Sequence, residues 1–168
     1  MINLSTKEKF LLEDEKEQEK LCVEKYKDFA QKAQDSQLSD LFSQLSQKEQ
    51  QHYDSICQLL NGTMPNINQQ QNQGIQQVNN TSIDKPNLNL ENVNSQIGQN
   101  NSYNEHDKML CIDSLSTEKY VSSTYNTAVF EFRDKNIRQI LNHIQKEEQE
   151  HGEKIFNYMS NHGMYQVK

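Results

Sequence analysis

The sequence is poor in apolar residues and carries few positive charges for its length. Only 33% of its 168 residues are hydrophobic, and the mean hydropathy of −1.01 is strongly polar. Part of the chain is therefore expected to lie outside any packed core. The 17 Lys and Arg residues are outnumbered by 24 Asp and Glu residues, which gives a net charge of −7. Nonspecific binding of nucleic acid needs a basic surface, so we expect no nucleic-acid partner.

Long hydrophobic runs and paired cysteines are also missing. No apolar stretch approaches the ~20 residues that span a bilayer, and Met1–Phe10 lacks the hydrophobic region of a signal peptide. We therefore expect no membrane partner, and synthesis in the cytoplasm without a signal peptide. The cysteines Cys22, Cys57 and Cys111 are odd in number and lack C-x-x-C spacing. This pattern favours reduced thiols, with a disulfide or a zinc site as the alternative.

Proline and glycine are scarce except in one segment. Residues 62–104 hold both prolines, three of the five glycines, and Asn/Gln runs such as Gln69–Gln73. The segment shows neither the helical period nor a sustained strand alternation. Its low hydrophobicity and Asn/Gln bias predict a disordered or loosely tethered linker. A prion-like or adhesive role is the alternative.

The rest of the chain is rich in helix-forming residues, with apolar residues at steps of three and four. Four helices are predicted, over residues 7–34, 37–60, 107–133 and 136–160. Asp35 and Asp134 supply turns and N-caps between them, and Asn61-Gly62 supplies a C-terminal stop. The Thr-, Val- and Tyr-rich stretch Tyr120–Phe132 would also suit a strand. Its helical spacing persists too long for one, so a helix is predicted there.

Two ionisable groups interrupt the apolar stripe of the last helix. That stripe reads Ile137, Leu141, Ile144, Glu148, His151, Ile155 and Tyr158. Every step is three or four residues, so these side chains share one face. The same Glu-x-x-His arrangement occurs 99 residues earlier as Glu49 and His52, again inside an apolar stripe. One such pair alone would be typical of a solvated helix face, but its recurrence in two stripes is not.

A shift of 99 residues aligns the two halves of the chain without a gap. The identical pairs include Leu11 and Leu110, Glu19 and Glu118, Tyr26 and Tyr125, Asp35 and Asp134, and Ile56 and Ile155. Most other stripe positions match in type. An internal repeat of this kind predicts two similar helical hairpins.

The spacing within each half adds a geometric argument. Glu19 and Glu49 are 30 residues apart, with their midpoint at Gln34 beside the predicted turn, and Glu118 and Glu148 have the same separation. Residues equidistant from the turn of an antiparallel hairpin lie level with each other. Each hairpin therefore brings two glutamates together, with a histidine one turn from the second. Packing the hairpins against each other places four Glu and two His in one layer.

The linker is long enough to cross such a bundle. A helix of ~25 residues is about 37 Å long, and a flexible chain of the linker's 43 residues spans about 36 Å on average. A long crossover between the second and third helices is the ferritin-like connectivity. The predicted fold is thus an all-α, ferritin-like four-helix bundle, a single domain over residues 1–168. It is made of two repeated helical hairpins joined by the linker 62–104.

The polar layer predicts a dinuclear metal centre. Each uncompensated buried carboxylate would cost several kcal/mol, whereas two divalent cations would neutralise the four. Oxygen-rich donors with one imidazole per metal suit Fe or Mn, and the pattern is that of di-iron and di-manganese carboxylate proteins. The predicted ligands are Glu19 and Glu118 as terminal carboxylates, Glu49 and Glu148 as bridges, and His52 and His151 as one imidazole per metal. The alternative is a vestigial site held by hydrogen bonds and carboxyl groups of raised pKa.

Other polar residues near the stripes have simpler interpretations. Tyr26 and Tyr125 are predicted to be core aromatics, with redox tyrosines as the alternative. Glu15, one turn from Glu19, is predicted to be a solvated residue at the bundle end, or else an extra carboxylate for metal uptake. The remaining residues are interpreted as surface charges (Glu147, Glu150 and Glu153) or as off-stripe or terminal histidines (His106, His143 and His162). No catalytic residue is assigned.

The segment Leu11–Gly62, with its Glu-Lys-Leu-Cys-Val-Glu-Lys-Tyr and its Glu-Gln-Gln-His, resembles the spore coat protein F-like family of endospore-forming bacteria. That family belongs to the ferritin-like superfamily, for which the Glu-x-x-His elements are specific. The resemblance covers both helical halves, and the Asn/Gln-rich insert departs from it. It implies a ferritin-like bundle in or near the spore coat, with other coat proteins as partners. A homodimer through the outer helix faces is the expected oligomer.

Two functions fit these observations. The first is a redox-active protein with two Fe or Mn ions that handles peroxide, superoxide or Fe(II), as similar manganese catalases, rubrerythrins and ferroxidases do. The second is a structural coat component in which the site only holds the bundle together or is vestigial. We predict a spore coat-associated protein with a dinuclear centre. Whether it is an enzyme stays open.

Overall fold

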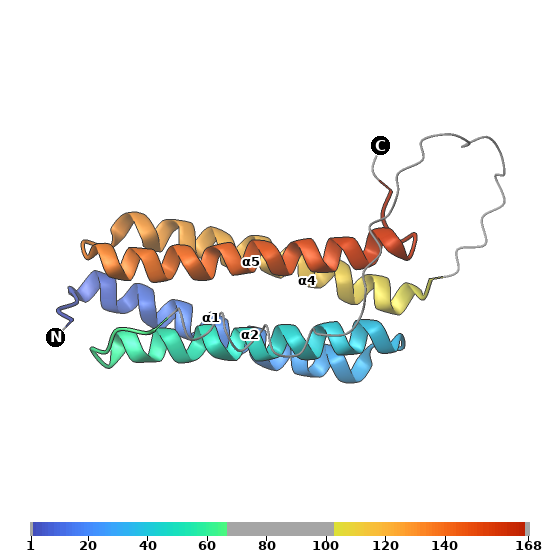
Figure 1. The fold of residues 1–168 in the computed structure, drawn as a ribbon, viewed down its shortest axis with the longest axis horizontal. Coiled ribbons are helices and arrows are strands. Elements are labelled where there is room, and N and C mark those ends of the chain that lie inside the picture. Colours follow the sequence, from blue (N-terminus) through green and yellow to red (C-terminus); the bar gives the residue numbers. More distant parts are fainter. Residues whose placement is uncertain (1, 67–102, 167–168) are drawn as a thin grey trace. The chain divides into compact units, whose positions relative to one another are not determined.

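All regular structure in the described part of the chain is helical. The computed structural model describes residues 2–66 and 103–166. The helices are α1 (Thr6–Lys32), α2 (Ser36–Leu60), α4 (Glu105–Glu131) and α5 (Lys135–Asn161). They pair as two antiparallel hairpins, α1 with α2 and α4 with α5 (Figure 1). The predicted all-α arrangement of two hairpins is confirmed, and each helix begins and ends within two residues of its predicted bounds.

Short polar side chains fix where the helices begin. The side chains of Asp35, Asn104 and Asp134 each accept hydrogen bonds from two backbone N–H groups in the first turn of the following helix. At α1, Ser5 and Glu8 form a reciprocal capping box. The cap at Asn104 starts α4 two residues earlier than predicted, because it lies at the edge of an Asn-rich stretch that offers no contrast in composition.

The helices pack through apolar stripes that lie on both sides of the polar layer. On α5, Ile144 precedes the layer and Ile155 follows it, and both are buried. One cluster gathers around Tyr26 and Phe42, whose rings stack with centroids 5.7 Å apart. It is composed chiefly of Tyr26, Leu38, Phe42, Leu45, Cys111, Ile155 and Met159. Apolar packing therefore flanks the layer on both sides along the helices.

Contacts between the hairpins set the direction of the helices. The start of α1 meets the end of α4 through Glu8 and Arg133, and the end of α1 meets the start of α4 at Asp107. Hence α1 and α4 are antiparallel, and Leu60 and Glu105 lie at opposite ends of the bundle. The predicted crossover requires this placement. Most of the predicted linker falls on residues 67–102, outside the described residues, so its disorder and the single-domain assignment stay predictions.

The two hairpins contact each other in a reciprocal way. Both carboxylate oxygens of Asp107 accept N–H groups of the α1–α2 turn, from Gln34 and Asp35, each at 2.9 Å. In return, Glu8 accepts the backbone N–H of Arg133 at 2.9 Å and its guanidinium, also at 2.9 Å. Glu8 and Asp107 are 99 residues apart. The repeat thus makes the same contact twice, as in an interface with twofold symmetry.

Candidate metal centre

The structure brings all six predicted ligands into one layer. Their side chains come from all four helices, and none of the residues is more than 4% exposed. The donor atoms form two groups in which they lie within 4.8 Å of one another. The first group contains Glu19, Glu49, His52 and Glu148, and the second contains Glu49, Glu118, Glu148 and His151. Each group offers three carboxylates and one imidazole, and Glu49 and Glu148 belong to both.

The histidines face the carboxylates of the opposite hairpin. Nδ1 of His52 lies 2.8 Å from Oε1 of Glu148, and Nδ1 of His151 lies 2.9 Å from Oε1 of Glu49. Both approaches have the distance of an ion pair without the geometry of a hydrogen bond. The rings stack at 5.6 Å between centroids. In both histidines Nδ1 is the nitrogen that points to the shared carboxylates.

Two buried tyrosines donate hydrogen bonds to Glu19 and Glu118, the glutamates that are not shared between the two ligand groups. The hydroxyl of Tyr26 donates to Oε1 of Glu118, and the hydroxyl of Tyr125 donates to Oε1 of Glu19. Both tyrosines are fully buried core aromatics. The other oxygen of each glutamate, Oε2, has no hydrogen bond within the described residues. One oxygen of each terminal carboxylate is thus fixed, and the other is free to bind a ligand.

Unpaired polar atoms are concentrated in the layer. Within the described residues, six of its buried atoms have no hydrogen-bond partner: Oε2 of Glu19, Oε1 of Glu49, Oε2 of Glu118, both carboxylate oxygens of Glu148, and Nδ1 of His151. Buried polar atoms without partners are uncommon and costly. Five of the six are carboxylate oxygens, which a hard divalent cation would satisfy. The donor set therefore fits the predicted metals.

Without cations the layer has to hold protons. Burial raises the pKa of Glu19 and of Glu148 to about 8, and burial together with the neighbouring Glu148 raises the pKa of Glu118 well above its usual range. Burial acts on Glu49 too, but the imidazoles of His151 and His52 beside its carboxylate outweigh burial and hold its pKa below the usual range. Burial opposes the charge of His52, yet the surrounding carboxylates raise its pKa. Metal ions would compete with these protons.

Glu147 is the residue near the layer that sequence reasoning missed. Its interpretation as a surface charge is wrong, because its side chain is only 15% exposed and its carboxylate lies 2.9 Å from Nε2 of His52. Burial would raise its pKa, but His52, Lys48 and His143 outweigh burial and lower it to about 2. Carboxylates in this position orient metal-binding histidines. Glu147 lies off the apolar stripe of its own helix, so the pattern of α5 gave no signal for this contact with α2.

Glu15 is also buried, contrary to its prediction as a solvated residue. It is 3% exposed and accepts a hydrogen bond from Thr124 at 3.0 Å. Burial raises its pKa to about 7. The residue lines a cavity of about 470 Å³ together with Asp14 and Glu17. The alternative prediction for Glu15, an extra carboxylate for metal uptake, is untested.

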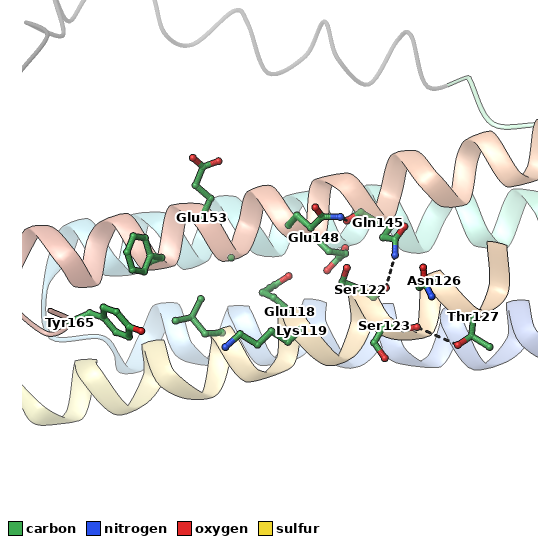
Figure 2. Close-up of a pocket in the computed structure, with 14 residues that line it drawn as sticks. Glu118, Lys119, Ser122, Ser123, Asn126, Thr127, Gln145, Glu148, Glu153 and Tyr165 are labelled. Atoms are coloured by element: carbon green, nitrogen blue, oxygen red, sulfur yellow. Dashed lines mark hydrogen bonds between the residues drawn. The ribbon is translucent and has the colours of Figure 1, made fainter. Parts of the chain in front are cut away.

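A larger groove lies between α4 and α5. Its cavity has a volume of about 830 Å³, and Glu118 and Glu148 are among its lining residues. Figure 2 shows these two glutamates facing each other between the helices, with Ser122 and Gln145 further along the groove. Gln145 donates to the backbone carbonyl of Ser122 at 2.9 Å, which ties the two helices together there. The layer thus meets the groove on the side of the second hairpin.

Residues 106–168 match the Coat F domain. The Coat F match covers nearly all of α4 and the whole of α5, and so includes three of the predicted ligands. It supports the resemblance to the coat family, although Leu11–Gly62, on which that resemblance was noted, lies outside the matched residues. Searches of curated proteins and of solved structures found no match to the chain. Of the helices described, none is long and apolar enough to cross a membrane.

Proposed function

We propose that this chain is a spore coat-associated protein whose ferritin-like bundle holds a dinuclear Fe or Mn centre. The observation that carries the metal proposal is the pair of ligand groups that share Glu49 and Glu148. The Coat F match supports the association with the spore coat. The match covers the second hairpin, and the 99-residue repeat carries the same ligand pattern into the first.

In this proposal each metal has its own pair of ligands and shares two others. Glu19 and His52 would hold one ion, Glu118 and His151 would hold the other, and the two shared glutamates would lie between them. Four carboxylates and two divalent cations make a neutral layer, which removes the cost of burying the charges. When bound, two adjacent ions of this kind supply Lewis-acid and redox chemistry toward an O–O bond or Fe(II).

The surrounding residues would keep the ligands in place. Tyr26 and Tyr125 each hold one oxygen of a terminal glutamate, across the interface between the hairpins. Glu147 holds Nε2 of His52, which leaves Nδ1 directed at the layer. Ligands whose orientation is fixed before binding lose less entropy when the metal binds. The groove between α4 and α5 favours a centre that reacts with peroxide or another small reactive oxygen species.

The alternative is a structural coat component whose metals only hold the bundle together, or whose site is vestigial. The observation in its favour is that most contacts in the layer cross from one hairpin to the other, such as Tyr26 to Glu118 and His52 to Glu148. A metal bound there would join the hairpins whether or not it reacts. Turnover is what separates the two functions.

Metal loading tests the proposal directly. The purified chain is loaded anaerobically with Fe(II) or Mn(II), the excess is removed, and bound metal is measured by elemental analysis. We expect about two ions per chain, as in carboxylate proteins with this ligand pattern. Less than about half an ion per chain would contradict the proposal, since intact sites should fill when ligands and metal are in excess. Two ions without peroxide breakdown or Fe(II) oxidation would select the structural function.

Substitution of one terminal ligand tests the assignment of residues. In Glu118→Ala the second ligand group loses the one ligand that α4 supplies to it. We therefore expect the loss of at least one ion per chain. Glu150→Ala is the matched control, because Glu150 is exposed on α5 between two predicted ligands. Unchanged stoichiometry in Glu118→Ala would reject the ligand assignment.

A further inference from the structure

The groove between α4 and α5 comes close to the proposed ligands because one side chain is missing. A Cβ atom added to Gly152 would lie 3.9 Å from Cβ of Glu118 and 4.0 Å from Cδ2 of Leu115. Gly152 has an ordinary helical backbone within α5, where glycine is unfavourable. Its backbone therefore does not require glycine. The effect of Gly152 on the structure is the space that it leaves beside Glu118.

The first hairpin has larger side chains at the equivalent positions. The 99-residue shift places Tyr53 at the position of Gly152 and Val23 at that of Ser122. Val23 is buried in the core, whereas Ser122 is partly exposed in the groove. Lys16, the counterpart of Leu115, also has the longer side chain of the two. The open space beside Glu118 is thus a feature in which the two halves of the repeat differ.

The lining of the groove indicates what kind of molecule it would take. Apart from Glu118 and Glu148, most of the polar side chains that line the groove are neutral hydrogen-bonding groups: Ser122, Ser123, Asn126, Thr127, Gln145 and Gln149. Only Lys119 and Glu153 add charges of opposite sign, and Leu115 and Phe156 add apolar surface. Such a lining offers little attraction to a divalent cation before it reaches the glutamates. It suits a small molecule that donates and accepts hydrogen bonds.

We propose that this groove binds a small hydrogen-bonding ligand of the peroxide class and leads it to the layer between Glu118 and Glu148. The proposal rests on the proposed metal centre and adds the side from which the ligand arrives. On this basis the two hairpins have different roles. Both supply metal ligands, but the second also admits the small molecule.

The test uses azide as a stable three-atom probe and Co(II) as a metal with visible absorption bands. The full chain is loaded with Co(II) and then titrated with azide. Gly152→Tyr introduces the side chain that the repeat already carries at Tyr53, and Gly152→Ala is the matched control, since its Cβ meets only ordinary van der Waals contacts. Filling the groove should weaken azide binding at least about tenfold in Gly152→Tyr and change it less than about twofold in Gly152→Ala. Bound Co(II) should be the same in all three proteins.

The outcomes separate this inference from the function on which it rests. If Gly152→Tyr binds Co(II) fully and takes azide as the unsubstituted chain does, the groove is not the route, while the metal centre stands. If the unsubstituted chain binds no Co(II), both proposals fail. Should Gly152→Tyr not fold, Ser122→Val narrows the same groove with the side chain found at Val23. Azide binding unaffected by that change would equally overturn the inference.

Discussion

Glu147 differs from the other acidic residues of α5 in what its carboxylate contacts. Glu150 and Glu153 are exposed, whereas Glu147 accepts a hydrogen bond from His52 on the neighbouring helix. The repeat does not reproduce this contact, because Lys48 occupies the equivalent position in α2. Lys48 instead lies 3.4 Å from Glu147 itself. The two proposed metal positions are therefore alike in their ligands and different in the groups that support them.

This difference predicts that loss of the Glu147 side chain affects the two proposed metal positions unequally. In Glu147→Ala, Nε2 of His52 loses its acceptor, and loss of such a partner typically lowers metal affinity by about 10–100-fold. We expect one ion to bind more weakly by this factor and the other to be unaffected. Titration with Mn(II) under equilibrium dialysis measures both steps. Glu150→Ala, on the same helix, serves as the control, and equal weakening of both steps in Glu147→Ala would contradict the prediction.

At the scale of helices and turns, each hairpin contacts the turn of the other through an acidic residue in the first turn of its first helix: Glu8 in α1 and Asp107 in α4. Asp107 is 1% exposed and accepts hydrogen bonds from the backbone N–H groups of Gln34 and Asp35. These two N–H groups lie between α1 and α2, outside the backbone hydrogen bonds of either helix. Backbone N–H groups in a turn need an acceptor when the turn is packed against another element. The start of α4 therefore serves as the cap of the α1–α2 turn. Glu8 does the same for the α4–α5 turn at Arg133.

Removal of the Asp107 side chain should destabilise the bundle without changing the contacts of the polar layer. In Asp107→Ala the backbone N–H groups of Gln34 and Asp35 lose their buried acceptor, for which we expect a decrease of about 1–3 kcal/mol in the free energy of unfolding. Glu105→Ala removes an exposed acid from the same helix turn, and its effect should stay within about 0.5 kcal/mol. Urea denaturation of the two variants measures the difference. Equal stabilities would show that the turn does not depend on Asp107.

The helices and the layer could be predicted because their signals are local or repeated. Stripe periodicity gave the helices, and the 30-residue separation of Glu19 and Glu49 placed them level across one turn. The contacts between hairpins could not be predicted in this way. The hydrogen bonds between Tyr26 and Glu118 and between Asp107 and Gln34 depend on the axial register of one hairpin against the other. Periodicity within a single helix does not encode that register. Glu147 and Glu15 were misassigned for the same reason, since both are buried by a neighbouring helix.

At the scale of the whole molecule, the polar layer couples stability to pH. The pKa values of Glu19 and Glu148 are raised to about 8 by burial, from an ordinary value of 4.5. Between these values the folded protein binds more protons than the unfolded chain, so the free energy of unfolding falls as pH rises. The raised pKa of His52 acts in the same direction above its ordinary value of 6.5. The lowered pKa values of Glu8 and Glu147, both about 2, act only below pH 4.5.

The metal-free protein should therefore melt at a lower temperature at pH 8 than at pH 5, and bound metal should reverse this trend. Metal binds to the deprotonated ligands, so its affinity rises with pH, and the stability that it adds rises as well. Thermal unfolding followed by circular dichroism, with and without Mn(II), measures the two curves. Metal-free Glu148→Gln is the control: it cannot lose this proton, so its melting temperature should fall less steeply. A metal-free melting temperature that rises from pH 5 to pH 8 would contradict the assignment of buried, protonated glutamates to the layer.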